Sequence, residues 1–401
     1  MKVLVICSKY GPEYSGPGHR AHHLYKRLKG KYGLSYDVLT NSIEFSDNAV
    51  YEYEGVKVRR VGKRLGTLTP NNFFSRAVNH FIYLFNYLSQ GYETLMVLRR
   101  GRYDVVHTFG SSISVNVGAL YAKCRNLPLL REVCNNGTHP EPFLPLNLNR
   151  VLRYRFDGRA CVVAISKRMG DFCRKAGVPE NRLWERPNPV DETMFSPGGP
   201  EKAALRRRLT KFGRDDIVLV YLAKFSPGKN QSFLIDVMKR LDSRYKLLLA
   251  GPVVGGGEFR ERDGKYFSTL LRSLDDEGLC DRVQVVKGYI KNPQDYMKLS
   301  NVYVFPSFFE ALGTPMLESI ACGVPVVANR IEGVTDCWIK EGRSGFVCDL
   351  EPEIFAECVK KAAAISGSVL EAEAREILQK ASAAIIDAEY YRLMHRFCLA
   401  R

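Results

Sequence analysis

Two carboxylates, Glu310 and Glu318, flank a segment whose composition is typical of an anion site. Between them, Gly313 precedes Thr314, which can cap a helix, and Pro315, which needs no N–H in a first helical turn. Free N–H groups at a helix start bind anions such as phosphate. The spacing therefore predicts a phosphate site with an acid on each side. Taken alone, Glu318 is also compatible with an acid stabilised by the helix dipole, and Glu310 with a solvated loop residue.

The flanking elements must hold this segment in place. Residues 302–305 form an apolar run that ends at Pro306, which predicts a buried strand. The helix is expected to run about two turns to Gly323, because glycine suits the position just after a helix. Residues 325–328 then begin another strand. Strand, loop, helix and strand form one βαβ unit with the anion site at its loop.

Two lysines, Lys224 and Lys229, follow another apolar run at residues 217–223. Lysines in a loop are often only solvated, but they also supply positive charge to a bound phosphate. The residues alone leave both interpretations open.

The pattern Glu310-x7-Glu318, followed by Ala-Cys-Gly-Val-Pro-Val-Val-Ala, resembles the donor-site motif of the retaining glycosyltransferases of family 4, which have the GT-B fold. The resemblance implies that Glu310 touches the donor sugar and that Glu318 binds the ribose hydroxyls. It places the donor phosphates on backbone amides of Leu312, Gly313 and Thr314. Pro315 has no N–H to offer.

The same resemblance assigns further donor residues. Lys224, where the family usually has arginine, and Lys229 would both meet the diphosphate. Gly251, Tyr289 and Ile290 match positions where the nucleotide base packs against the backbone.

In the first half, the apolar run 3–7 is followed by a glycine-containing loop and a helix. Gly16 matches the first glycine of a Gly-Gly loop that faces the donor phosphate in the family, whereas Pro17 departs from the second. His107 ends an Asp-Val-Val-His sequence, and members of the family often have the same four residues at this place. We therefore expect a catalytic role for His107. His19, His22 and His23 cluster without a matching acid, and no metal site is expected there.

The segment 127–142 departs from the family, in which many members end this strand with a sugar-facing His or Asp. Its polar side chains suit recognition of hydroxyl groups, so Glu132, Asn135 and His139 are candidates for contact with the sugar or the acceptor.

At 401 residues, the chain is expected to form two domains. Apolar runs alternate with helical or loop segments, which indicates α/β structure with parallel, doubly wound sheets. The resemblance implies a GT-B fold, with two Rossmann-like domains and a cleft between them. We expect residues 1–192 and a returning C-terminal helix at about 385–401 to bind the acceptor, and residues 193–384 to bind the donor. Four prolines, at 187, 189, 197 and 200, mark the linker.

Composition narrows the classes of protein. The net charge of +16 indicates attraction to an anionic substrate or surface. Eleven cysteines without any Cys-x-x-Cys pair argue against a zinc site or a disulfide framework. No apolar run reaches the roughly 20 residues of a spanning helix, and the first residues do not resemble a signal peptide. We therefore expect a cytoplasmic protein.

Residues 73–102 are both aromatic and basic, and they end with Arg99, Arg100 and Arg102. They fit either a helix that lies in the interface of an anionic membrane or an ordinary core helix with a solvated basic end. No nucleic-acid-binding motif surrounds them, so nucleic acid is not expected as a partner.

The resemblance implies a retaining hexosyltransferase that uses a UDP- or GDP-sugar. We expect it to need no cofactor or metal, because no Asp-x-Asp sequence occurs. The acceptor would be a glycan or lipid-linked precursor of cell-envelope polysaccharide or lipopolysaccharide, met at the inner face of the membrane. A soluble acceptor is the alternative. A sugar-nucleotide epimerase of the same fold and a catalytically silent carbohydrate-binding subunit are the competing functions.

Overall fold

The computed structural model describes residues 1–399 apart from 14, 43–44, 63–64, 69–71, 135–159 and 254–258. The chain forms two compact units, one made of Met1–Arg186 with Asp387–Arg401 and the other of Pro187–Ile386. The chain therefore passes between the units at Arg186 and Pro187, a few residues before the expected boundary. It passes back within its last helix, α14 (Ala383–Leu399).

The first unit is built on one sheet in the order β3-β4-β2-β1-β5-β6-β7-β8. Its pairs are parallel except for the antiparallel pair β3 and β4. β1, β5, β6 and β7 have almost no exposed residues, as expected for continuous apolar strands covered on both faces. The strands are β1 (Lys2–Cys7), β2 (Ser35–Thr40), β3 (Ala49–Tyr53), β4 (Val56–Arg60), β5 (Val105–Phe109), β6 (Leu129–Val133), β7 (Ala160–Ala164) and β8 (Leu183–Glu185).

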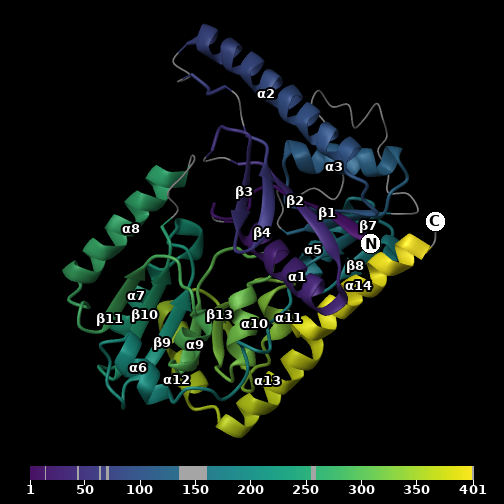
Figure 1. The fold of residues 1–401 in the computed structure, drawn as a ribbon. Helices are drawn as coiled ribbons and strands as arrows, with labels where there is room; N and C mark the ends of the chain where they lie inside the picture. Colours follow the sequence, from purple (N-terminus) through teal and green to yellow (C-terminus); the bar gives the residue numbers. More distant parts are fainter. Residues whose placement is uncertain are drawn as a thin grey trace. The chain divides into compact units, whose positions relative to one another are not determined.

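Apart from α14, the described helices of this unit connect successive strands (Figure 1). Ile6 and Val106 on the sheet share one core cluster with Val115 and Ala119 on α3 and Leu98 on α2. The described helices are α1 (Gly16–Tyr32), α2 (Phe73–Arg100), α3 (Ile113–Cys124), α5 (Lys167–Lys175), the short η2 (Glu180–Arg182) and most of α14.

The second unit has an all-parallel sheet in the order β11-β10-β9-β12-β13-β14. The strands are β9 (Ile217–Leu222), β10 (Tyr245–Gly251), β11 (Val283–Lys287), β12 (Val302–Phe305), β13 (Val326–Asn329) and β14 (Gly345–Cys348). The helices are α6 (Lys202–Leu209), η3 (Pro227–Lys229), α7 (Phe233–Lys239), α8 (Phe259–Asp276), α9 (Pro293–Lys298), α10 (Thr314–Ala321), α11 (Thr335–Trp338), α12 (Pro352–Ala363) and α13 (Gly367–Ala381).

Both sheets reverse their strand order at one place, β1 beside β5 in the first unit and β9 beside β12 in the second. Ligands of open α/β sheets bind at the carboxyl ends of the strands where the order reverses. The loop before Gly16 follows β1, and the loops that carry Lys224, Lys229 and Glu310 follow β9 and β12. The parallel α/β architecture predicted from the sequence is thus confirmed.

Candidate functional site

Two loops of the second unit, after β9 and after β12, are joined by hydrogen bonds. The hydroxyl of Tyr221 at the end of β9 lies 2.7 Å from Ser307 Oγ and donates to the backbone oxygen of Lys229 at 3.0 Å. The N–H of Phe308 donates to the oxygen of Gly228 at 3.1 Å. These contacts fix the two loops against each other at the carboxyl edge of the sheet.

Glu310 and Lys229 meet where these loops join. The ammonium group of Lys229 donates to Glu310 Oε1, and Ser307 Oγ donates to the same oxygen at 2.9 Å. Both side chains keep some exposure to solvent. The structure therefore brings together a predicted sugar-binding acid and a predicted phosphate-binding lysine, which are 81 positions apart in the sequence.

Lys224 lies in the same loop, and its Nζ is 4.0 Å from Asp263 Oδ2. Asp263 is completely buried on α8, and its Oδ1 accepts from both Nε and Nη2 of Arg262. Gln231 Nε2 donates to the backbone oxygen of Lys224 at 2.9 Å. The loop is thus held through its backbone, and Lys224 sits near the buried carboxylate of Asp263.

The helix that follows β12, α10, begins differently from the prediction. The N-cap residue is Gly313 rather than Thr314. Gly313 has a left-handed φ of 75°, a backbone conformation that residues other than glycine rarely adopt. A Cβ at this position would also come within 2.7 Å of the Phe305 ring. No side chain caps the helix, so no side chain would compete with an anion for the amide groups around Gly313 and Thr314. Thr314 Oγ1 instead accepts from Asn188 Nδ2 at 2.6 Å.

Glu318 lies one turn into α10 and is partly exposed. Within the described part of the chain, its carboxylate has no hydrogen-bond or ion-pair partner. Burial, and then repulsion from Asp191, raise its pKa to about 7. A carboxylate with raised pKa and no protein partner has its acceptor oxygens available to a ligand.

Three other predicted donor residues follow the neighbouring strands. Gly251 ends β10 with φ 157°, and a Cβ there would lie 2.0 Å from the oxygen of Ala223. Its own oxygen accepts from the N–H of Gly288 at 2.9 Å. Tyr289 and Ile290 come directly after this bond, and the Tyr289 side chain is 60% exposed. Leu312 has a buried side chain, so only its backbone can contribute to the site.

In the first unit, Glu132 is the centre of a buried charged cluster. Its carboxylate accepts from His107 Nε2 at 3.1 Å, from Arg186 Nη2 and from the hydroxyl of Tyr390. Arg20 Nη1 lies 3.8 Å from the same carboxylate. Burial opposes ionisation of Glu132, but Arg186, His107 and Arg20 outweigh burial and lower its pKa.

This burial bears on two predicted roles. His107 and Glu132 are both fully buried, and the hydroxyl oxygen of Tyr25 lies 2.7 Å from Nδ1, the other ring nitrogen of His107. Burial lowers the pKa of His107, and Glu132 offsets this only in part. In this structure both side chains are occupied by protein partners and hold each other in place. A catalytic role for His107 and a sugar contact for Glu132 stay predictions, and Asn135 and His139 lie outside the described residues.

Gly16 is the first residue of α1, and Ser15 caps this helix by accepting from the N–H of Gly18 at 3.1 Å. A Cβ at Gly16 would meet nothing within 4 Å, whereas at Gly18 it would lie 2.4 Å from the oxygen of Lys9. Close packing therefore requires glycine at position 18, a requirement that the sequence did not reveal. Gly16 lies at the exposed start of the helix, where no such packing requires glycine. Among the described residues, no group of three His, Cys, Asp or Glu side chains is arranged to hold a metal ion.

Sequence reasoning missed several residues that hold the site together: Tyr221, Ser307, Asn188, Arg186 and Tyr390. Asn188 had a signal, since it stands between Pro187 and Pro189 in the proline-rich linker. Tyr221 and Tyr390 had none, because a tyrosine in an apolar run is indistinguishable from a core residue until its hydroxyl partner is known.

Comparison with known proteins adds independent information. Residues 203–382 match the family model described as glycosyl transferases group 1. A D-inositol 3-phosphate glycosyltransferase of Catenulispora acidiphila is 26% identical over 283 residues, which cover 66% of this chain and 65% of the relative. A GDP-mannose-dependent phosphatidylinositol monomannoside mannosyltransferase of Mycolicibacterium smegmatis is 31% identical over 180 residues, which cover 43% and 44%. The chain thus spans less than two thirds of either relative.

Solved structures resemble the whole chain. Anabaena HepE in complex with UDP and glucose has a TM-score of 0.71 at 16% identity, with 99% of this chain and 100% of that chain covered. Sucrose-phosphate synthase of Thermosynechococcus elongatus has a TM-score of 0.78 at 18% identity, with 100% of each chain covered. At such identities the likeness shows the fold alone, and it confirms the expected GT-B fold of two Rossmann-like units.

Proposed function

We propose that this chain, whose residues 203–382 match the family model of the glycosyl transferases group 1, transfers a hexose from a nucleotide-diphosphate sugar to a glycan or lipid-linked acceptor. One observation carries the proposal. Glu310, Lys229, the uncapped start of α10 and the unpartnered Glu318 lie together at the carboxyl ends of β9 and β12. Lys229 and the amide dipoles at the start of α10 can bind a diphosphate. Glu310 can bind the sugar on one side of it, and Glu318 the ribose on the other.

The proposed division of work follows from these groups. Lys229, with Lys224 nearby, and the amides of Leu312, Gly313 and Thr314 would stabilise the leaving diphosphate, so that no metal is required. Glu318 would accept hydrogen bonds from the ribose hydroxyls, and Glu310 would contact the donor sugar. Gly251, Tyr289 and Ile290 would receive the base, and Gly16 would face the phosphate from the start of α1.

We further propose retention of configuration, as in family 4, with attack from the face that the diphosphate leaves. Such a displacement needs no protein nucleophile, and a β-phosphate oxygen can take the acceptor proton. The bond from the anomeric carbon to the diphosphate oxygen breaks while the acceptor oxygen bonds to the anomeric carbon, and the proton passes from the acceptor hydroxyl to the β-phosphate oxygen. Glu310 and Lys229 then act by holding the sugar and the leaving group rather than by covalent chemistry.

The names of the relatives support the range of substrates. One relative is described as GDP-mannose-dependent and as acting on a phosphatidylinositol mannoside, and one structural neighbour was solved with UDP and glucose. A Staphylococcus aureus relative, 27% identical over 150 residues, is described as a capsular polysaccharide biosynthesis glycosyltransferase. These names favour a UDP- or GDP-sugar donor and an acceptor in polysaccharide or glycolipid synthesis. We propose that the enzyme meets this acceptor at the cytoplasmic face of the membrane.

The test is a calorimetric screen of UDP- and GDP-sugars, followed by product analysis. We expect at least one nucleotide to bind and its sugar to be released slowly to water without an acceptor. Glu318→Ala should weaken nucleotide binding by about 1.5–3 kcal/mol, as for a hydrogen bond to a charged group. Glu332→Gln, an exposed acid between β13 and α11, is the control and should leave binding unchanged.

Three results would contradict the proposal. Conversion of a nucleotide sugar into its epimer would identify the epimerase alternative. Tight binding without hydrolysis or transfer to any acceptor would favour the silent carbohydrate-binding subunit. Unchanged affinity of Glu318→Ala for both UDP and GDP would remove Glu318 from the donor site.

A further inference from the structure

Helix α2 (Phe73–Arg100) has its polar face toward the protein and its apolar face toward solvent. The polar side chains that it buries are Ser75, Asn79, Asn86, Gln90 and Thr94. In contrast, Phe74 is 73% exposed and Phe81 is 71% exposed. A helix that packs on a protein core has the opposite arrangement. The interpretation of residues 73–102 as an ordinary core helix therefore fails for most of α2 and holds only for its last turn, where Leu98 is buried in the core.

The buried polar side chains explain how α2 is held. Asn79 Oδ1 accepts from the N–H of Leu68 at 2.7 Å, and its Nδ2 donates to the oxygen of the same residue at 2.8 Å. Asn86 makes the same pair of bonds with Leu65, at 3.0 and 2.7 Å. Nearer the sheet, Gln90 accepts from Asn41 Nδ2 at 3.0 Å. These hydrogen bonds attach the helix to the protein through its polar side chains. The exposed apolar side chains of the helix are therefore not needed for this attachment.

Five of the exposed apolar side chains of α2 form one stripe, because their spacing follows the helical repeat. The members of this stripe are Phe74, Phe81, Phe85, Leu88 and Tyr92, all of them exposed. Leu65 and Leu68, which are hydrogen-bonded to Asn86 and Asn79 of the helix, are exposed as well. Contiguous exposed aromatic surface of this kind marks an interaction site.

The stripe ends in a basic region. Arg99, Arg100 and Arg102 are exposed, and none of them forms a salt bridge with another described residue. Glu93 is the one acid between residues 73 and 102. Positive charge therefore stands beside the apolar stripe with little acid to balance it.

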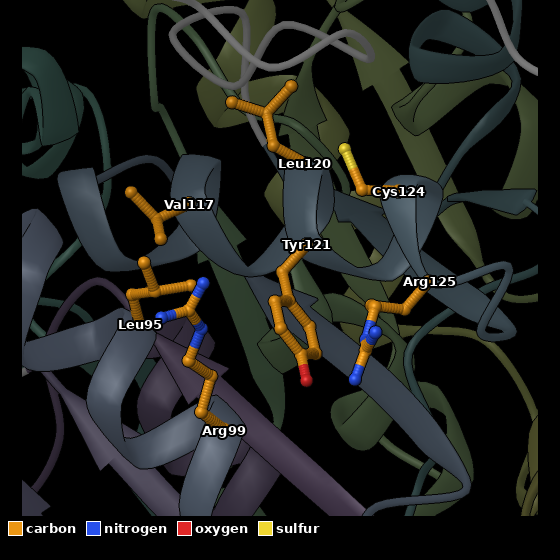
Figure 2. A pocket seen from close by; sticks show the side chains of 7 residues that line it. All are labelled: Leu95, Arg99, Val117, Leu120, Tyr121, Cys124 and Arg125. Carbon is orange, nitrogen blue, oxygen red and sulfur yellow. The ribbon is translucent and has the colours of Figure 1, made fainter.

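A hollow of about 690 Å³ opens between the carboxyl-terminal halves of α2 and α3 (Figure 2). Leu95, Val117 and Leu120 form apolar parts of its lining. Figure 2 shows the Tyr121 ring between the guanidinium groups of Arg99 and Arg125, and Arg125 lies 5.9 Å from the centre of this ring. An apolar floor with two cations at its rim suits an anionic head group with part of its chain.

We propose that the exposed face of α2 is a docking surface for an anionic lipid bilayer. The helix would lie in the plane of the interface, with Phe74, Phe81 and Leu88 between the head groups and Arg99 and Arg100 on lipid phosphates. No helix among the described residues is long and apolar enough to cross a membrane. The docking rests on the proposed function only in that it would bring the enzyme to a lipid-linked acceptor.

Charge favours a bilayer over a second copy of the chain. A second copy would present the same arginines, and it has only Glu93 on this helix to pair with them. Like charges at a contact oppose association, whereas phosphate groups of anionic lipid attract each nearby arginine. An anionic bilayer would cover the apolar stripe and pair with the basic end of the helix at the same time.

The test is flotation of the whole protein with vesicles of phosphatidylcholine and phosphatidylglycerol in equal amounts. We expect strong binding at about 0.01 M salt, where the Debye length is about 30 Å, and weaker binding at about 0.15 M, where it is about 8 Å. Changing Phe81 and Leu88 together to serine should lower the partition coefficient about tenfold. Changing Arg99, Arg100 and Arg102 to serine should lower it about 100-fold at low salt.

Matched controls separate this surface from net charge and general hydrophobicity. Changing Leu271 and Ile354 to serine removes two exposed apolar side chains from the second unit. Changing Arg207, Arg214 and Arg272 to serine removes the same charge as the triple arginine variant, also from exposed positions of that unit. Both controls should bind vesicles within about threefold of the unchanged protein, since neither surface is expected to meet lipid. All four variants should keep the melting temperature and the nucleotide affinity of the unchanged protein, measured without lipid.

Other outcomes would overturn the proposal. Equal loss of vesicle binding in the control variants would mean attraction by net charge alone. A dimer in sedimentation velocity that the Phe81 and Leu88 change dissociates, together with absence of vesicle binding, would identify an interface between copies. Because donor binding is measured without vesicles, failure of lipid binding leaves the glycosyltransferase proposal standing, and failure of donor binding leaves the docking surface standing.

Discussion

Arg186 Nη2 donates to both carboxylate oxygens of Glu132, at 3.0 Å each. Arg186 is the last residue of the first unit before the chain leaves it, and Glu132 stands near the end of β6. Tyr390, shortly after the chain re-enters this unit at Asp387, donates to the same carboxylate. One buried acid therefore anchors the chain beside both places where it passes between the units.

Removing that charge should destabilise the first unit strongly. In Glu132→Gln, Arg186 and Arg20 lose their carboxylate in a buried place, so we expect a loss of about 3–5 kcal/mol in the free energy of unfolding. Tyr390→Phe removes one hydrogen bond and should cost about 1–3 kcal/mol. Urea unfolding can be followed by Trp184, whose ring centre lies 4.8 Å from that of Tyr390, in a Trp338→Phe background. Asp171→Asn, which breaks only exposed pairs, should cost about 1 kcal/mol or less. A loss as small in Glu132→Gln would contradict the anchoring role.

Lys229 and Glu310 should have opposite effects on donor binding, although they are paired in this structure. Lys229→Ala removes a cation from the diphosphate and should weaken UDP or GDP binding by about 1.5–3 kcal/mol. Glu310→Ala releases Lys229 from its carboxylate, so binding of the bare nucleotide should be kept or improved while sugar transfer is lost. Calorimetry and a transfer assay on the same preparations check both expectations. Equal loss of binding in the two variants would show that the pair only holds the loops together.

The raised pKa of Glu318 predicts a pH-dependent stability. Burial and Asp191 raise this pKa from 4.5 to about 7, so the folded protein keeps a proton that the unfolded chain has released. The contribution of Glu318 to the free energy of unfolding should therefore fall as pH rises from about 4.5 to about 7, and then stay constant. Glu318→Gln lacks this fall. Its free energy of unfolding, minus that of the unchanged protein, should therefore be larger at pH 8 than at pH 5. We expect a difference of about 1–3 kcal/mol between the two pH values in urea unfolding. A constant difference between the two proteins would show an ordinary pKa.

Activity should not depend on a divalent metal. The chain has no Asp-x-Asp sequence, and Lys224 and Lys229 can supply positive charge to the leaving diphosphate. Sugar release from the donor should therefore survive dialysis against EDTA. A strict requirement for added magnesium or manganese would contradict the proposed role of the lysines. Lys229→Ala provides the comparison, because rescue of this variant by metal would show that charge at the diphosphate is what it lacks.

The sequence by itself determined the α/β architecture and much of the donor side of the site. Continuous apolar runs such as Val302–Phe305 are long enough and β-rich enough to be buried strands, and Gly323 ends the helix after them with φ 74°. Glu310, Gly313 and Glu318 lie on one loop and one helix, so local spacing fixes their order along the site. The roles of these residues depend on their spacing along one short segment, so they could be predicted from the sequence.

Only the tertiary structure decided which distant side chains meet. The pair Lys229–Glu310 joins two loops far apart in sequence, and the cluster around Glu132 draws on β5, β6, the passage at Arg186 and α14. The orientation of α2 was also undecided, because its aromatic and polar residues each repeat with helical spacing and either face could be buried. The hydrogen bonds from Asn79 and Asn86 to the backbone of Leu68 and Leu65 bury the polar face. Such partners are backbone groups, which carry no signal in the amino-acid sequence.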